Sequence, residues 1–334
     1  MYRMLGTLSL AVTVCLLNRA PVAAQSFEAL GTRAQGMGGA FVGVADDASA
    51  VYWNPAGLAF GAYVTLVLDS STGKAEPDDE PQAGSRSANL IALGTPPLGL
   101  SYYRLRQTSL VPAAALTNPL DPETVRVQRL TTHQAGVTVV QSLLDNLAVG
   151  ATVKLVRGIA SQGVVVGADR DDLLDEAGDL PDAASNKFDA DVGVMTTFGG
   201  FRAGLTIRNI TEPDFETPGD AAAIELQRQT RAGISYIAIQ GLVLAADIDI
   251  ERVNGSLGEA RYLATGAEAQ IVRRAFARGG FRLNTLSDQP GGLAPVYSLG
   301  GSFAVLSSLI VDAQVTLGSD AGDRGWGVAG RVVF

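Results

Sequence analysis

The sequence contains very few of the residues on which metal, redox and nucleophilic chemistry usually depends. Among its 334 residues there is one cysteine, Cys15, and one histidine, His133. One cysteine cannot form an internal disulfide. One histidine is too few for a multi-histidine metal site, and it is too few for a Ser-His-Asp triad that is assisted by a second histidine base. No other acid–base or nucleophile constellation stands out along the chain. We therefore expect no catalytic residues, no metal, no cofactor and no enzymatic activity.

Charge and long apolar runs are scarce as well. Only 18% of the residues are charged, whereas a soluble protein usually has about a quarter. The net charge is −9 and there is no basic stripe, so the chain is a poor nucleic-acid binder. Beyond the N-terminus no stretch reaches about 18 consecutive apolar residues, which excludes transmembrane helices there. A membrane protein without such helices must be a closed barrel, because lipid satisfies no backbone polar groups.

The first 24 residues are typical of a secretory signal peptide. Arg3 precedes an apolar stretch over 5–17, and small residues lead up to Ala24, after which we expect cleavage. The alternative is a short membrane anchor, but this stretch is too short to span a bilayer. Cleavage would also remove Cys15, which leaves the mature chain without a thiol ligand or nucleophile.

From residue 61 onward, segments of about ten residues alternate apolar and polar side chains. Between 309 and 317 the odd positions are Leu, Val, Ala, Val and Leu, and the even positions are Ile, Asp, Gln and Thr. Successive side chains of a strand point to opposite faces, so this segment has an apolar side and a polar side. Segments 242–251 and 201–208 repeat the pattern. The following segments, fourteen in all, are predicted as strands: 61–69, 87–95, 97–107, 127–141, 146–157, 186–198, 200–210, 223–238, 241–252, 259–271, 274–285, 294–306, 308–318 and 324–334.

The connections between these strands alternate in length. The short ones lie near Pro96, Leu144, Gly199, Gln240, Arg273 and Ser307. The longer ones cover 70–86, 108–126, 158–185, 211–222, 253–258, 286–293 and 319–323. An even number of strands with short turns at one end and long loops at the other is typical of outer-membrane barrels. The sequence therefore predicts an all-β fold, a 14-stranded antiparallel transmembrane β-barrel over residues 61–334 in the bacterial outer membrane.

The last predicted strand ends in Phe334, with Trp326 and Val328 on the same face. A terminal aromatic residue after an alternating strand resembles the signal by which outer-membrane barrels are recognised for assembly. We therefore expect the barrel assembly machinery and outer-membrane lipids as partners. His133, within a predicted strand, is interpreted as an interfacial residue.

Charged side chains gather on the strand faces opposite to the apolar ones. Both signs are present in the set, which comprises Lys154, Asp189, Asp191, Arg202, Arg208, Glu225, Arg231, Asp247, Asp249, Glu251, Glu268, Arg278, Arg282, Asp312 and Arg331. The interior of an eight-stranded barrel is filled by its own side chains, whereas barrels of sixteen or more strands enclose a water channel. A fourteen-stranded barrel lies between these limits, so we expect a lumen that needs a plug. An ion-selective ring would favour one sign, so the mixture predicts internal ion pairs and contacts with a plug.

Residues 25–60 do not follow the strand pattern. Gly36, Gly38 and Gly39 permit close backbone approach and left-handed turns. These glycines do not follow a strand and no Lys-Ser or Lys-Thr pair follows them, which argues against a nucleotide-binding loop.

Two acidic residues and a turn signal follow the glycines. Asp46 and Asp47 lack the spaced oxygen ligands of a calcium loop, so we interpret them as caps of a short helix that begins at Ala48. Asn54-Pro55 is a turn signal that ends this helix. A compact coil of small residues just before the first strand is suited to folding back into a lumen.

The stretch RAQGMGGAFVGVADDASAVYWNPAGLA resembles the N-terminus of the FadL/TodX-like outer-membrane transport superfamily and, within it, the PorV/PorQ subgroup. The resemblance implies that the N-terminal segment forms a hatch inside the lumen of a fourteen-stranded barrel. It assigns hatch roles to Gly36, Gly38, Gly39, Asp46, Asp47, Asn54, Pro55 and Ala56. The implied organisation is a signal peptide over 1–24, a hatch over 25–60 and a barrel over 61–334.

The resemblance implies two functions. FadL-like members pass hydrophobic molecules such as fatty acids across the outer membrane, whereas PorV-like members bind secreted protein cargo in type IX secretion. We expect the first, with a hydrophobic small-molecule ligand captured near the long loops before a local hatch shift opens its path. The candidate capture residues are Leu110, Val111, Leu116, Leu120, Leu173 and Leu174, for which ordinary loop packing is the alternative role. Cargo binding and a purely structural role as an anchor stay open as alternatives.

Overall fold

The computed structural model describes residues 30–76, 82–112, 124–166, 170–219, 222–255, 258–288, 292–319 and 323–334. The expected signal peptide over 1–24 lies outside the described residues, as do the candidate capture residues Leu116 and Leu120.

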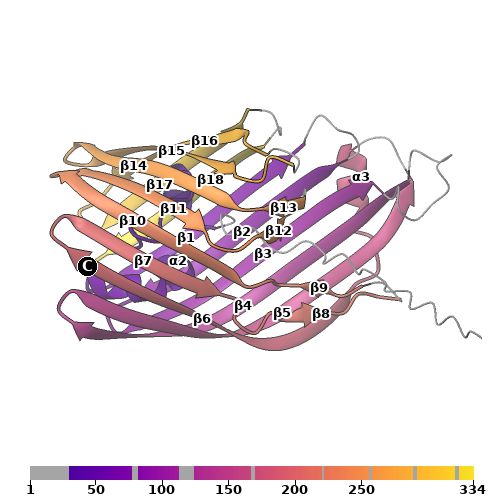
Figure 1. The fold of residues 1–334 in the computed structure, drawn as a ribbon, viewed down its shortest axis with the longest axis horizontal. Helices are drawn as coiled ribbons and strands as arrows, with labels where there is room; N and C mark the ends of the chain where they lie inside the picture. Colours follow the sequence, from indigo (N-terminus) through magenta and orange to yellow (C-terminus); the bar gives the residue numbers. More distant parts are fainter. Residues whose placement is uncertain are drawn as a thin grey trace, which may run out of the picture.

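The wall of the molecule is a single closed barrel of fourteen antiparallel strands (Figure 1). In order around the wall these are β1 (Thr65–Ala75), β2 (Ala83–Gly94), β3 (Leu98–Pro112), β4 (Thr124–Leu144), β5 (Leu147–Val166), β6 (Ala183–Phe198), β7 (Phe201–Arg208), β10 (Gln229–Ile239), β11 (Leu242–Asp249), β14 (Tyr262–Val272), β15 (Ala275–Asn284), β16 (Pro295–Ala304), β17 (Leu309–Gly318) and β18 (Arg324–Val333). Strand β18 closes the wall against β1, with Thr65 paired to Val333. The prediction of a fourteen-stranded antiparallel barrel is confirmed.

Within the described parts of the connections, four short strands form two small hairpins. They are β8 (Asp214–Phe215) with β9 (Ile224–Glu225), and β12 (Val253–Gly255) with β13 (Gly258–Ala260). The predicted strands 223–238 and 259–271 are therefore wrong at their starts, because the wall strands begin at Gln229 and Tyr262.

Glu225 and Glu251 were expected to line the lumen, and this prediction is wrong. Glu225 belongs to the β8–β9 hairpin. Glu251 follows β11 and pairs with Arg228 at 3.3 Å, in a connection at the long-loop end. The apolar–polar alternation continues from the wall into the hairpin, and a period of two residues cannot tell which strand a segment pairs with.

Side chains alternate between the two sides of the wall as the period-two pattern requires. In β17, Val311 and Val315 are exposed on the outside, whereas Asp312 and Thr316 are buried inside. The pattern repeats in β18, where Trp326 and Val328 are exposed. The outer surface of the wall is therefore apolar, whereas its inner surface combines polar and charged side chains with apolar ones that pack against the interior.

The two ends of the barrel differ. Turns of two to four residues join strands at one end, for example 145–146 between β4 and β5, and this short-turn end also carries the C-terminus. The other end carries the long connections, including the short helix α3 (Arg170–Glu176) (Figure 1). Strand β4 has 21 residues, which at about 3.3 Å per residue corresponds to roughly 70 Å, while β7 has 8. Strands β3–β6 therefore extend beyond the rest of the wall at the long-loop end.

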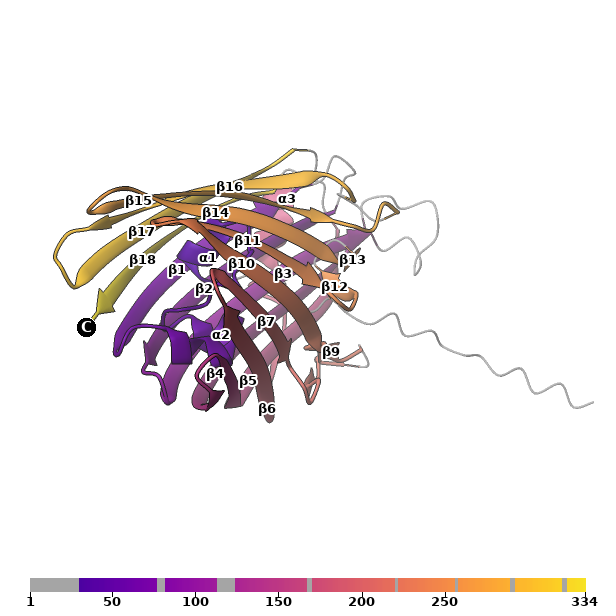
Figure 2. The ribbon, with the colours of Figure 1, turned by 60° about the vertical axis from the view of Figure 1, so that its left-hand side comes forward.

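Residues 30–60, which we call the N-terminal segment, lie inside the barrel (Figure 2). They contain α1 (Thr32–Gly36), α2 (Ala50–Trp53) and the 3₁₀ helix η2 (Pro55–Phe60). Helix α1 contacts β15–β18 and β1, and η2 contacts β4–β6, so the segment reaches the wall on two sides. Among the described residues no helix is long and apolar enough to cross a membrane.

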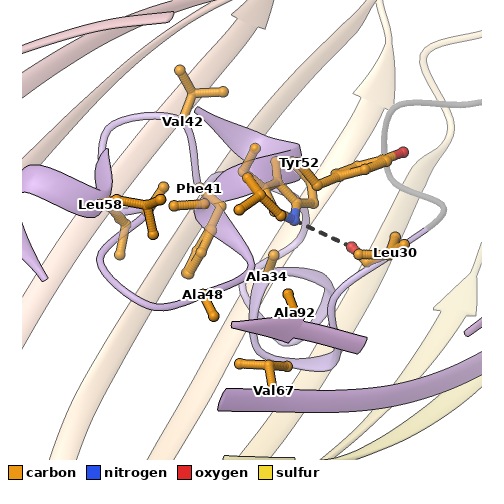
Figure 3. Packing of buried hydrophobic residues seen from close by; sticks show 14 of the residues in the cluster. Leu30, Ala34, Phe41, Val42, Ala48, Tyr52, Leu58, Val67 and Ala92 are labelled. Carbon is orange, nitrogen blue, oxygen red and sulfur yellow. Dashed lines mark hydrogen bonds between the residues drawn. The ribbon is translucent and has the colours of Figure 1, made fainter. Parts of the chain in front are cut away.

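The main apolar core lies between the N-terminal segment and the inward-facing side of the wall (Figure 3). Phe41, Tyr52 and Trp53 are fully buried in it, and Trp53 Nε1 donates a hydrogen bond to Leu30 O at 3.2 Å. The aromatic rings meet edge to face, with 5.9 Å between the centroids of Phe41 and Trp53. The segment is thus packed against the wall through buried side chains rather than lying loosely in a channel.

Candidate functional site

Glycines on both sides allow the backbone of the N-terminal segment to touch the wall. Gly38 has φ +68°, and a Cβ atom there would lie 2.6 Å from the backbone nitrogen of Phe281 in β15. On the wall, a Cβ atom at Gly150 of β5 would lie 2.5 Å from the backbone nitrogen of Ala56. Both distances are shorter than real side chains tolerate, so each position requires glycine. The sequence pointed to Gly38 but not to Gly150, whose only signal is a glycine at an inward-facing strand position.

The other two glycines of the motif serve the same contact. A Cβ atom at Gly36 would lie 3.3 Å from Gly300 Cα in β16 and 3.6 Å from Gln314 Cβ in β17. Gly39 has φ +86°, and its carbonyl accepts a hydrogen bond from Arg231 Nη1 at 3.4 Å. Gly36 and Gly38 therefore place the end of α1 and the turn after it directly against β15–β17, whereas Gly39 contacts β10.

Asn54 ties three elements together. Its Nδ2 donates to Val42 O within the segment and to Val194 O of β6, both at 3.1 Å, and its Oδ1 accepts from Ala56 N at 3.2 Å. The last bond caps η2, where Pro55 takes the first helical position and needs no amide donor. The turn expected at Asn54-Pro55 is present, and the buried Asn54 side chain also fastens it to the wall.

The two adjacent aspartates have other roles than predicted. Helix α2 begins at Ala50 rather than Ala48, and no side chain caps its N-terminus. Asp47 Oδ1 instead accepts from the backbone nitrogen of Ser49 at 2.9 Å, in a local turn before the helix. Asp46 pairs with Arg33 at 2.5 Å. The capping interpretation is therefore wrong, because the carboxylates are drawn to a buried arginine.

Six charged side chains form a closed ring of ion pairs between the N-terminal segment and the wall. The ring runs Arg33–Glu268 (2.8 Å), Glu268–Arg278 (2.5 Å), Arg278–Asp312 (3.1 Å), Asp312–Arg331 (3.1 Å), Arg331–Asp47 (3.4 Å) and Asp47–Arg33 (3.0 Å). Two members belong to the segment and the other four to β14, β15, β17 and β18. Positive and negative groups alternate and balance, so the buried ring carries no net charge. The predicted internal ion pairs are present, and those of Arg33 and Asp47 join the N-terminal segment to the wall.

Wall carboxylates also hold the backbone of the segment. Asp247 Oδ2 in β11 accepts from the backbone nitrogens of Phe41 and Val42, each at 2.8 Å. Asp69 Oδ2 in β1 accepts from Thr32 N at 2.6 Å. Sequence reasoning identified Asp247 as inward-facing and missed Asp69, although the alternation in β1 places Asp69 on the same side.

Polar and aromatic side chains occupy the lumen on the long-loop side of α2. Lys154 Nζ pairs with Asp189 at 3.1 Å and Asp191 at 2.8 Å, and all three are buried. The Arg208 guanidinium lies 3.5 Å from the centre of the Tyr52 ring. Above them the β8–β9 hairpin packs Phe215, Ile224 and Leu226 against the inward-facing Leu130, Val156 and Ala160 of β4 and β5. The long connection between β7 and β10 therefore folds over this part of the lumen.

The structure brings two of the candidate capture residues together. Leu110 of β3 and Leu173 of α3 lie in one buried apolar cluster, with Leu174 partly buried against it. Val111 belongs to β3. Helix α3 is also tied to β1 by an ion pair from Lys74 to Asp171, and this hydrogen bond lowers the pKa of the Asp171 carboxyl. In this arrangement the leucines pack the loop against the wall.

The remaining predicted residues lie on the wall. Phe334 is 72% exposed, and its backbone exchanges hydrogen bonds with Val64, next to the start of β1. The Nδ1 atom of His133 in β4 lies 2.7 Å from the Tyr102 hydroxyl of β3, on the outside of the barrel. Within the described part of the chain, no group of three or more His, Cys, Asp or Glu residues is placed to hold a metal ion.

Comparisons with solved structures give consistent neighbours. The Ralstonia pickettii toluene transporter TbuX matches with a TM-score of 0.66 and 13% identity, over 92% of this chain and 99% of that one. A Pseudomonas aeruginosa FadL homologue matches with 0.61 and 11%, over 91% and 98%. The Pseudomonas putida toluene transporter TodX matches with 0.61 and 12%, over 92% and 99%. The chain has the fold of these transporters.

Comparisons of the sequence are less informative. Residues 124–249 match a family described as "F plasmid transfer operon, TraF, protein", which is less than half of the chain. No curated protein matches the sequence. The expected FadL/TodX-like architecture is therefore supported by fold, while the PorV/PorQ subgroup is not confirmed.

Proposed function

We propose that this chain is a bacterial outer-membrane barrel that passes small hydrophobic compounds, with the N-terminal segment as its hatch. The observation that carries the proposal is the segment itself, which fills the lumen of an apolar-walled barrel yet belongs to no wall strand. Side-chain hydrogen bonds, ion pairs and close glycine contacts hold it, and these can break locally without opening the wall. The shared fold with toluene and hydrocarbon transporters supports the same class of function.

The lining of the lumen indicates what could pass. Tyr52, Tyr103, Phe41 and Trp53 are buried in the interior, with the Arg208 guanidinium over the Tyr52 ring, so a molecule would contact them once the N-terminal segment shifts. Aromatic faces and edges give an apolar ligand favourable contact at little conformational cost. We infer a compact hydrophobic substrate, either a monoaromatic hydrocarbon or a fatty-acid-like chain.

A reversible disulfide tests the hatch. Gly36→Cys and Gln314→Cys would join α1 to β17, because a Cβ atom at Gly36 lies 3.6 Å from Gln314 Cβ, within the range of disulfides. The matched control is Gly36→Cys alone. The mature proteins would be reconstituted in liposomes, and entry of toluene and of a medium-chain fatty acid would be measured before and after reduction.

We expect the oxidised double variant to block entry and the reductant to restore it, with the single variant unaffected throughout. Entry at the same rate in the oxidised and reduced double variant would overturn hatch gating. Entry of neither compound into liposomes carrying the unmodified protein would overturn transport itself. Co-purification of a secreted β-domain would then favour the cargo-binding alternative.

The same proposal includes the route to the membrane. We propose that residues 1–24 are removed on export and that Phe334 is read by the barrel assembly machinery. N-terminal sequencing of protein from isolated outer membranes would test the cleavage after Ala24. A folded yield unchanged by Phe334→Ser would argue against a role for Phe334 in assembly.

A further inference from the structure

The outer wall changes character sharply across β3–β6. One row of paired residues, Tyr102, Ala135, Leu155 and Phe188, ends the apolar surface of these four strands toward the long-loop end. The next outward-facing row pairs Arg104 with His133 and His133 with Arg157. We call these three residues the basic row. Consecutive outward-facing rows are about 7 Å apart, so the cations stand directly above the apolar surface.

A further arginine extends the basic row. Arg106 lies one outward-facing position beyond Arg104 on β3, opposite Thr131. Since neighbouring strands are about 4.8 Å apart, the backbones of Arg104 and Arg157 lie about 10 Å from each other across His133. The long side chains of two arginines on such a base can reach the same group in front of the wall.

Arg104, Arg106 and Arg157 have no carboxylate partner within ion-pair distance among the described residues, and the charged groups that act on His133 and Arg106 are other basic residues. His133 interacts with Arg104 and Arg157, and Arg106 interacts with Arg104 and Arg129. Several exposed basic residues elsewhere at this end do have acidic partners, for example Lys187 with Asp214 and Arg324 with Glu76. In a chain with a net charge of −9, a cluster of like charges that lacks a counter-charge attracts an external anion.

The Tyr102 hydroxyl orients the centre of the basic row. It lies 2.7 Å from His133 Nδ1 and holds the imidazole between the two arginines. With the hydroxyl as donor, the proton of the neutral ring sits on Nε2, which is then a further donor toward the outside. Arginine is the residue best matched to phosphate, because its planar guanidinium offers paired donors.

We propose that the basic row, with Arg106, binds the phosphorylated headgroup of a lipid in the leaflet that faces the long-loop end. The lipid chains would lie on the row of Tyr102, Leu155 and Phe188, where Phe188 is 75% exposed, and the phosphate would meet the arginines above. The combination of an apolar surface with cations along one edge identifies a lipid rather than a free anion. The site rests on the membrane placement of the barrel and does not require passage through the lumen.

The test compares headgroups on one protein. Native mass spectrometry of the mature protein in mild detergent would measure binding of bis-phosphorylated lipid A, phosphatidylcholine and inorganic phosphate. The variant Arg104→Gln/Arg157→Gln would be set against the control Arg324→Gln, which removes an exposed arginine outside the row. Heat-modifiable migration on gels would establish that each variant is folded. The variant Arg104→Lys/Arg157→Lys would keep both positive charges but lose the paired guanidinium donors.

We expect lipid A binding to weaken by about tenfold for each arginine removed, with the lysine variant between the two and the control unchanged. Phosphatidylcholine binding should be weak and the same in all proteins. Equal lipid A binding by the glutamine variant and the unmodified protein would overturn the proposal. Binding of inorganic phosphate as tight as that of lipid A would also overturn it, because the site would then recognise a free anion.

Discussion

Replacing Glu268 with glutamine removes one negative charge from the ring of ion pairs that joins α1 to the wall. Glu268 contacts Arg33 at 2.8 Å and Arg278 at 2.5 Å, and all three side chains are nearly inaccessible to solvent. Removing one partner of a buried ion pair costs about 3–5 kcal/mol. Arg33 keeps Asp47 at 3.0 Å, so we expect the lower end of this range, about 3 kcal/mol.

This loss should fall on the docking of the N-terminal segment rather than on the barrel. Hydrogen exchange reads such local opening directly, and about 3 kcal/mol corresponds to roughly 150-fold faster exchange. We expect that increase for the amides around Arg33, with little change in the wall strands. The control Glu251→Gln breaks an exposed pair with Arg228 and should change exchange by less than about fivefold. Unchanged exchange in α1, or equal acceleration throughout the wall, would refute the idea that the ring holds the segment in place.

Three further changes test the packing and the sidedness of the wall. Gly150→Ala should destabilise the folded protein by about 1–3 kcal/mol, because the new Cβ atom would meet the backbone of η2. The control Gly330→Ala faces open space and should leave the melting temperature unchanged. Equal melting temperatures of the two variants would contradict the close contact at Gly150. Leu244→Arg places a charge on the apolar outer face at a cost of about 2–4 kcal/mol and should lower the yield of folded barrel. Asp247→Asn keeps an oxygen acceptor and should leave that yield unchanged. Similar yields of the two variants would contradict the assignment of the inner and outer faces of β11. Leu173→Ser removes an apolar side chain from the buried cluster and should make the β5–β6 connection easier to proteolyse. The control Leu306→Ser lies at an exposed turn and should not change proteolysis. Loss of uptake by Leu173→Ser without faster proteolysis would instead indicate that Leu173 captures ligand.

The strands and their sidedness were predictable because each depends on local alternation. The alternation of apolar and polar residues from Leu309 to Leu317 is enough to predict β17. The same alternation of period two placed Asp312 and Asp247 on the inner face. The hairpin of β8 and β9 was not predictable, because Glu225 and its neighbours alternate as well as any wall strand. Pattern alone does not record which strand lies beside them.

The contacts of the N-terminal segment were predictable in kind but not in detail. The glycines indicated close packing, Asn54-Pro55 indicated a turn, and mixed charges indicated ion pairs. That Arg33 meets Glu268, 235 residues later, follows from closure of the barrel and leaves no trace in the local sequence. Asp47 was for the same reason interpreted as a helix cap, which its immediate neighbours favour.

The two anchorages of the N-terminal segment have a mechanical consequence. Helix α1 is attached to β15–β18 and β1, while η2 is attached to β4–β6 on the other side, and the chain between them crosses the interior. The segment therefore acts as an internal brace that fixes the distance between two arcs of the wall. Release of one anchorage would let one arc relax while the other keeps the brace in place. Under the hatch function that we propose, a passage would then open beside α1 or beside η2 while the segment stays in the barrel, and the barrel would change its cross-section.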